Sequence, residues 1–216
     1  MTSLLPPGPL LGAFLIASVL LAVTPGPGVI YIVTRTLAQG RRSGLASVFG
    51  VAVGNFGNAL AAAIGLGALF AVSSTAFLIV KYAGALYLIY LGIQSFRQQK
   101  PEADAPPQQV MEAGRIFRDG FLVALLNPKT AIFFAAFLPQ FMSASGSPIL
   151  QSVVLGTLFV VIAAFSDTVY ALTASAVAPM LSRLQGSRSV GRFLTGAAFI
   201  ALGLFTAFSG SHNANR

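Results

Sequence analysis

The sequence contains no cysteine and a single histidine, His212, which lies in a polar stretch at the carboxyl end. Without thiols the chain can form no disulfide, thiol redox relay or thiolate metal site. Soft metal ions are bound by thiolate and imidazole ligands, so neither a metal exporter nor a bound cofactor is expected. Ser166 precedes Asp167 but has no histidine to activate it, so we do not expect a hydrolase or another enzyme.

Charged residues are also scarce. They make up 8% of the chain, against about a quarter of an ordinary soluble domain, and 56% of the residues are apolar. This composition predicts a polytopic membrane protein with the lipid bilayer as its surroundings. The net charge of +8 does not indicate nucleic-acid binding, because the basic residues lie in short clusters between apolar runs. The first residues carry no basic segment, so no cleavable signal peptide is expected.

The apolar runs predict an all-α fold of six transmembrane helices. The expected spans lie near residues 9–34, 44–72, 76–96, from 120 onward, 149–178 and 190–208. A polar segment that contains several prolines, residues 97–119, is predicted to be a solvated cytoplasmic linker. It separates a three-span unit at 1–96 from a second unit at 120–208, and a disordered tail is expected at 209–216.

Prolines interrupt the first span of each unit. Thr24-Pro25-Gly26-Pro27-Gly28 lies within the first span, and Asn127-Pro128-Lys129 lies at the corresponding place in the fourth. Proline removes a backbone donor and clashes with the preceding turn, so both helices should break there. Lipid cannot satisfy the freed groups, so each break should face protein or a water-filled cavity. Since three spans are an odd number, the second unit should insert upside down, as in transporters built from inverted repeats.

The second span carries two further patterns. Gly50 and Gly54 form a face of small residues, which predicts that another helix packs closely against it. Asn55 and Asn58 are spaced to share one part of the same helix. Buried amides in a span act either as fasteners between helices or as ligand contacts.

Two opposite charges are expected deep in the membrane. Asp167 is the only acid outside the predicted linker, and a carboxylate within a span indicates a functional site with a partner. We predict Lys129 as that partner. At about 1.5 Å of rise per residue, Pro25, Asn55, Lys129 and Asp167 all lie roughly 14 to 18 Å deep in a core about 30 Å thick. An ion pair that only locks two helices is the alternative.

Four short motifs together resemble the LysE/RhtB family of amino-acid exporters. They are Thr24-Pro25-Gly26-Pro27, Gly84-Ala85-Leu86-Tyr87-Leu88, Asn127-Pro128-Lys129 and Leu138-Pro139-Gln140-Phe141. The resemblance covers nearly the whole chain. It implies a bacterial inner-membrane exporter of amino acids or close derivatives, with a small-molecule substrate and the proton as coupling ion.

The residue chemistry agrees with a zwitterionic ligand. Helix amino ends at Pro25 and Pro128, with the cation of Lys129, suit a carboxylate, whereas Asp167 and freed carbonyls suit an ammonium group or a proton. The predicted substrate or coupling residues are Thr24, Pro25, Gly26, Pro27, Asn55, Asn58, Asn127, Pro128, Lys129 and Asp167. A membrane scaffold or assembly factor that transports nothing is the second hypothesis. Whether copies associate as a homo-oligomer is left open.

Basic residues predict the orientation. They are concentrated after the first, third and fifth spans, and such segments face the cytoplasm. Both termini are therefore expected outside. With one acid visible within the spans, a dibasic substrate would lack a second counter-charge, which favours a neutral amino acid.

Overall fold

The computed structural model describes residues 5–65, 74–97, 112–143, 146–185 and 188–208. All regular structure in these ranges is helical, with no strand among them. The described helices include several that are long and apolar enough to cross a bilayer. The predicted all-α polytopic membrane protein is confirmed. Most of the predicted linker and the tail at 209–216 lie outside the described residues.

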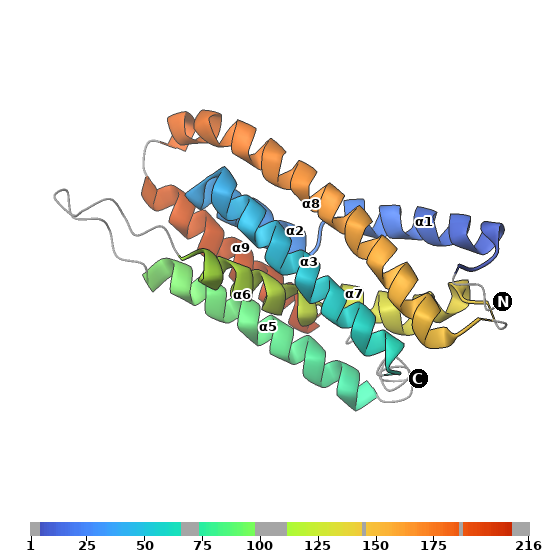
Figure 1. Ribbon diagram of the computed structural model, residues 1–216. Helices are drawn as coiled ribbons and strands as arrows, with labels where there is room; N and C mark the ends of the chain where they lie inside the picture. The colour runs from blue at the N-terminus through green and yellow to red at the C-terminus, as the bar shows by residue number, and fades with distance from the viewer. Residues whose placement is uncertain (1–4, 66–73, 98–111, 144–145, 186–187, 209–216) are drawn as a thin grey trace.

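Each of the two units predicted from the sequence begins with an interrupted helix (Figure 1). The first unit contains α1 (Gly8–Val23), α2 (Pro27–Gln39), α3 (Arg41–Ala63) and α5 (Ser74–Arg97). The second contains α6 (Ala113–Leu125), α7 (Pro128–Ile132), a π-helical turn η1 (Phe133–Phe137), a 3-10 turn η2 (Leu138–Phe141), α8 (Pro148–Gln185) and α9 (Arg188–Phe208).

Five of the six expected crossings meet the length and composition of a membrane span. Three are single helices, in α3, α5 and α8. The other two are bent pairs, α1 with α2 at 44° and α6 with the segment Pro128–Phe141 at 47°. In α9 the described apolar stretch is Gly196–Phe208, which is shorter than a full membrane span. The sixth crossing therefore stays a prediction.

Helix α6 begins at Ala113, inside the segment predicted to be linker. Asp119, assigned to the solvated linker from the sequence, lies in this helix with a side chain only 1% exposed. Its charge is compensated by Arg35 of α2, 3.5 Å away, which lets a carboxylate lie inside the bundle. The statement that Asp167 is the only acid within the spans was therefore wrong.

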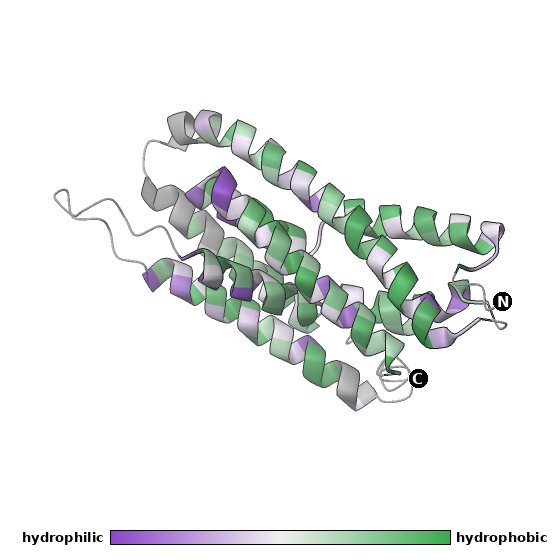
Figure 2. Ribbon diagram, in the orientation of Figure 1, coloured by the Kyte–Doolittle hydropathy of each residue, from purple (hydrophilic) through white to green (hydrophobic). Residues whose placement is uncertain are grey.

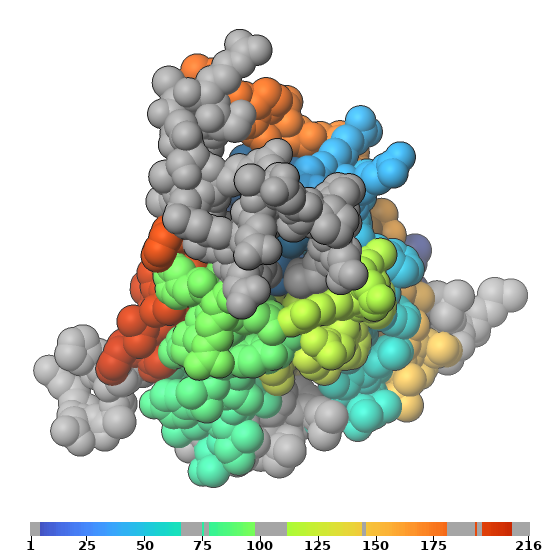
Figure 3. Space-filling view, turned by 90° about the vertical axis from the view of Figure 1, so that its left-hand side faces the viewer, coloured from blue at the N-terminus to red at the C-terminus, as the bar shows by residue number. Residues whose placement is uncertain are grey.

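Hydrophilic residues gather at one end of the bundle (Figure 2). Helix α2 ends there at Gln39, α3 begins with Arg41 and Arg42, and α5 ends at Arg97. Figure 3 looks onto this end, where the ends of α3, α5 and α6 are visible together. We call it the basic end. The remaining length of the helices is mostly apolar, as a lipid environment requires.

The two units pack against each other along most of their length. Helix α3 contacts both α6 and α8, and α5 contacts α9. If the units are inverted repeats, as the sequence predicts, α3 corresponds to α8 and α5 to α9, and these contacts are the ones expected across a two-fold axis. The small-residue face of α3 is confirmed as a packing face, because a side chain at Gly50 or Gly54 would overlap the carbonyls of Phe117 or Phe121 in α6.

Candidate functional site

The break between α1 and α2 leaves backbone carbonyls without helical partners. Thr24 and Gly26 both have extended backbone conformations, and Pro27 begins α2. The last four carbonyls of a helix have no donor within it, and two prolines prevent the helix from continuing. These carbonyls, of residues 21–24, lie at membrane depth and need donors from elsewhere in the protein.

Side chains of the second unit supply those donors. The hydrogen bonds are Lys129 Nζ to the carbonyls of Leu21 (2.9 Å) and Thr24, Ser166 Oγ to Ala22 (3.2 Å), and Tyr170 Oη to Val23 (2.8 Å). Each of the four carbonyls therefore accepts from α7 or α8. Side chains of the second unit thus hold the carboxyl end of α1. The conformation of this break therefore depends on how the two units are placed relative to each other.

The second break is capped by its own asparagine. The Oδ1 of Asn127 accepts from the amide of Lys129 (3.0 Å), and its Nδ2 donates to Thr130 Oγ1 (3.1 Å). Nδ2 of Asn58, from α3, donates to the carbonyl of Ala124 at the end of α6 (2.9 Å). Asn58 therefore fastens two helices rather than facing a ligand.

The amino end of α2, by contrast, has no side-chain cap. Gly26 provides no side-chain cap, Pro27 has no amide hydrogen, and the amides of Gly28 and Val29 belong to the first turn, where no helical acceptor exists. A helix amino end with free amides attracts anions. Of the two amino ends predicted to bind a carboxylate, only the one at α2 is uncapped.

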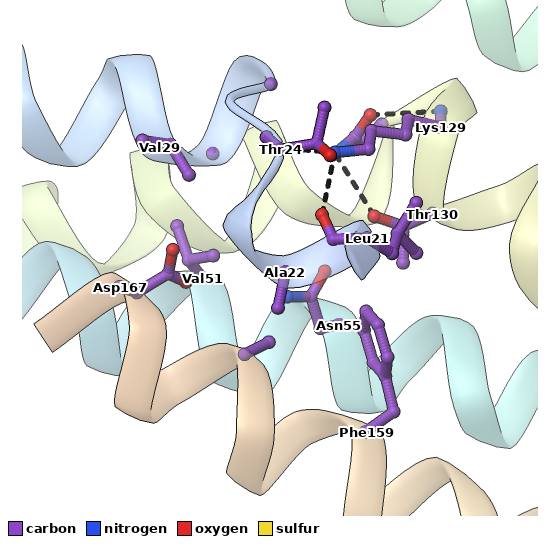
Figure 4. A pocket seen from close by; sticks show the side chains of 14 residues that line it. Leu21, Ala22, Thr24, Val29, Val51, Asn55, Lys129, Thr130, Phe159 and Asp167 are labelled. Atoms are coloured by element: carbon purple, nitrogen blue, oxygen red, sulfur yellow. Dashed lines mark hydrogen bonds between the residues drawn. The ribbon is translucent and has the colours of Figure 1, made fainter. Parts of the chain in front are cut away.

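A cavity of about 40 Å³ lies between the two breaks (Figure 4). Six of the ten predicted site residues line it: Thr24, Gly26, Asn55, Asn127, Lys129 and Asp167. The three prolines shape the breaks without lining the cavity, and Asn58 lies apart from it. A volume of this size holds roughly three water molecules.

Lys129 and Asp167 line the same cavity but do not form the predicted ion pair. No contact within 4 Å joins them, and Figure 4 shows them on different sides of the cavity. The ammonium of Lys129 is held instead by the carbonyls at the end of α1. Asp167 is 5% exposed and receives no hydrogen bond from the described residues. The carbonyls of the broken helix hold the ammonium, so Lys129 and Asp167 line the cavity without direct contact, and Lys129 as the charge partner of Asp167 stays a prediction.

The sequence analysis missed several residues of the cavity wall. Thr130 follows Asn127 by one helical turn, and Val51 precedes Asn55 by one turn on α3. Phe159 and Ala163 lie two turns and one turn before Asp167 on α8. A count of three or four residues from each predicted polar residue would have found Thr130, Val51 and Ala163, and a second count of four would have reached Phe159, since these spacings mark one helix face.

Comparison with known proteins identifies the family. A family model described as LysE type translocator matches residues 19–210. The chain belongs to this family. A homoserine/homoserine lactone efflux protein of Salmonella typhimurium is 33% identical over 195 residues, covering 90% of this chain and 94% of that protein. A leucine efflux protein of Salmonella choleraesuis is 28% identical over 129 residues, covering 59% and 61% of the two chains.

Another relative of this LysE-type translocator is described only by its location. It is the uncharacterized membrane protein YrhP of Bacillus subtilis, 28% identical over 211 residues, covering 91% of this chain and 98% of its own. No solved structure matches the chain significantly. The family and the apolar helices together make this chain a multi-pass membrane translocator of the export type.

Proposed function

We propose that this translocator exports amino acids or close derivatives across the bacterial inner membrane in exchange for protons. One observation carries the proposal: a single cavity at the two helix breaks is lined by an ammonium and a carboxylate that are not paired with each other. A ligand with both charges satisfies both groups at once. An amino acid is such a ligand, and the relatives named as homoserine and leucine efflux proteins agree with it.

The carboxylate of the substrate has donors on one side of the cavity. Lys129 has three ammonium hydrogens, of which two are used by the carbonyls of Leu21 and Thr24. The third is free for a substrate carboxylate. The open amides of Gly28 and Val29 add the positive end of the α2 dipole. Lys129 thus binds the substrate without leaving the break that it stabilises.

The ammonium of the substrate faces Asp167. This carboxylate is buried and has no donor among the described residues, so a cation in the cavity supplies its missing counter-charge. Asn55 lines the cavity with an Oδ1 that accepts no hydrogen bond, and gives a second acceptor. Asp167 binds either the substrate ammonium or a proton, and this alternation couples export to proton entry.

A neutral amino acid suits the cavity best. Asp119 is a second buried acid, but it is bonded to Arg35 and Tyr87 and does not line the cavity. The cavity therefore offers one carboxylate, which matches one ammonium group. In the orientation we propose, the basic end faces the cytoplasm and both termini face outward.

Competition in proteoliposomes tests the proposed function. The purified protein would take up labelled homoserine into vesicles with an acidic lumen, and a protonophore should abolish accumulation. Unlabelled leucine should compete, whereas lysine should not. A folded protein that moves none of these amino acids and co-purifies with a fixed partner would instead support the scaffold.

A further inference from the structure

A second cluster of charged and hydroxyl groups lies outside the cavity. Arg35 of α2 and Asp119 of α6 form an ion pair, with Nη2 and Oδ2 3.5 Å apart. Their side chains are 5% and 1% exposed, so the pair is shielded from solvent. The transport site does not use either residue. Arg35 belongs to the first unit and Asp119 to the second, so the pair joins the two units directly.

Three helices meet at the Asp119 carboxylate. Tyr87 of α5 donates to Oδ1 (3.0 Å), and Arg118, its neighbour on α6, contacts the same oxygen (3.3 Å). The guanidinium of Arg35 lies over the ring of Tyr31, 5.4 Å from its centroid, and Tyr31 Oη donates to the carbonyl of Ile116 (2.8 Å). Two independent links therefore tie α2 to α6 at this level.

The cluster lies between the cavity and the basic end. Val29 lines the cavity, and Arg35 follows it by roughly 9 Å along α2, in the direction of Gln39. Asp119 precedes the break at Asn127 by a similar length of α6. A buried apolar cluster that includes Ile32, Val48, Val123 and Phe199 also contains Val51 of the cavity wall and Tyr31, which packs against Arg35. The apolar cluster therefore connects the cavity wall with the charged cluster.

We infer that Arg35 and Asp119 form the inner gate of the translocator, an ion pair that breaks when the site opens to the cytoplasm and re-forms when it closes. The inference rests on the proposed function, in which the two units rock against each other. A buried ion pair adds little net stability because desolvation offsets attraction, so its separation costs little when opening of the site admits water to both charges. Asp119 Oδ2 accepts no hydrogen bond from the described residues, so Arg35 is its only described partner, at 3.5 Å.

Accessibility of the cavity tests the gate without measuring transport. The chain has no cysteine, so Thr130→Cys, in the cavity wall, would be its only thiol. A small charged methanethiosulfonate reagent would be added to inverted vesicles, whose outer surface is the cytoplasmic face. The reagent should react slowly with the thiol of the Thr130→Cys variant. Adding Arg35→Gln or Asp119→Asn should speed it roughly tenfold, because loss of the bridge shifts the population toward the open state.

Arg118→Gln is the matched control. Arg118 contacts the same carboxylate but lies on the same helix as Asp119 and is 61% exposed, so its removal breaks no link between units. The labelling rate should not change in this variant. The charge exchange Arg35→Asp with Asp119→Arg should restore slow labelling. Right-side-out vesicles should show no faster reaction in any variant, since the outer side of the cavity does not contain the pair.

Several outcomes would overturn the gate. An unchanged rate in both single variants, or an equal rise from both membrane faces, would make the pair an ordinary fastener. Should neither charge variant fold, Tyr87→Phe removes a hydrogen bond from Asp119 without stranding a charge, and it should raise the inner labelling rate by a smaller factor. No rise there would also contradict the gate. Labelling does not depend on transport, so failure of the gate is distinguishable from failure of the proposed function.

Discussion

The ammonium of Lys129 lies 2.9 Å from the carbonyl of Leu21, a residue of the other three-span unit. It also donates to Thr24, and these carbonyls belong to a helix that prolines have interrupted. Asp167 lines the same cavity and is left without a described donor. A cation that would otherwise neutralise the carboxylate is held elsewhere, which keeps both charges available to a ligand.

This arrangement predicts unequal effects of removing the two charges. Lys129→Met should lower the stability of the folded protein by about 1–3 kcal/mol for each carbonyl left without a donor. Asp167→Asn breaks no described hydrogen bond or ion pair and should fold like the parent. The stability of each variant is measured as the fraction of protein that stays monodisperse after heating in detergent. If the two residues formed a structural pair, the double variant would regain stability and transport; we expect it to remain unstable and inactive.

The proline break should be needed for transport but not for folding. In Pro25→Ala with Pro27→Ala, the two missing amide hydrogens return and α1 and α2 can join into one helix. Expression should persist while homoserine uptake is lost. Pro179→Ala is the control, since Pro179 lies exposed within α8 and does not line the cavity. Normal uptake by a well-expressed double variant would show that the break is a harmless kink.

Close packing of α3 on α6 predicts a strong effect of a small substitution. At Gly50 an added methyl group overlaps the backbone carbonyl of Phe117, which cannot move aside as a side chain could. Gly50→Ala should therefore reduce stability by about 1–3 kcal/mol. At Gly12 an added methyl group meets nothing within 4 Å, so Gly12→Ala should leave thermal stability unchanged. Equal melting curves for the two variants would refute the packing described for α3 and α6.

The orientation predicts which introduced cysteines react in whole cells. Ala38 and Ala113 are exposed at the basic end, and Gln140 is exposed at the opposite end of the second unit's first span. An impermeant maleimide should label Gln140→Cys in intact cells. Ala38→Cys and Ala113→Cys should react only after the inner face is exposed. The reverse pattern would place the basic end outside.

Much of the architecture was predictable because it depends on local chemistry. Apolar length predicts spans, and proline breaks a helix wherever it stands in the interior, so the interruptions near Pro25 and Pro128 follow from the sequence. Gly50 and Gly54 likewise predicted a packing face, which the structure assigns to α6. Each of these features is fixed by residues within one or two helical turns.

The partners of buried charges were not predictable in the same way. Lys129 contacts Leu21, and Arg35 contacts Asp119, so both contacts join residues far apart in sequence whose meeting depends on how the units pack. Asp119 also follows a polar stretch, and its neighbours suggested a solvated linker. Only the three-dimensional arrangement shows that an arginine from another helix compensates its charge.

The central claim is that Asp167 exchanges a proton for the substrate ammonium in the cavity. The most direct measurement is accumulation of labelled homoserine in proteoliposomes with an acidic lumen, for the parent protein and for Asp167→Asn at equal amounts of folded protein. We predict that the parent accumulates homoserine when the pH gradient is imposed. Asp167→Asn should show no accumulation above the level of protein-free vesicles, since asparagine neither binds a proton nor carries the counter-charge. Undiminished, gradient-dependent accumulation by Asp167→Asn would contradict the account.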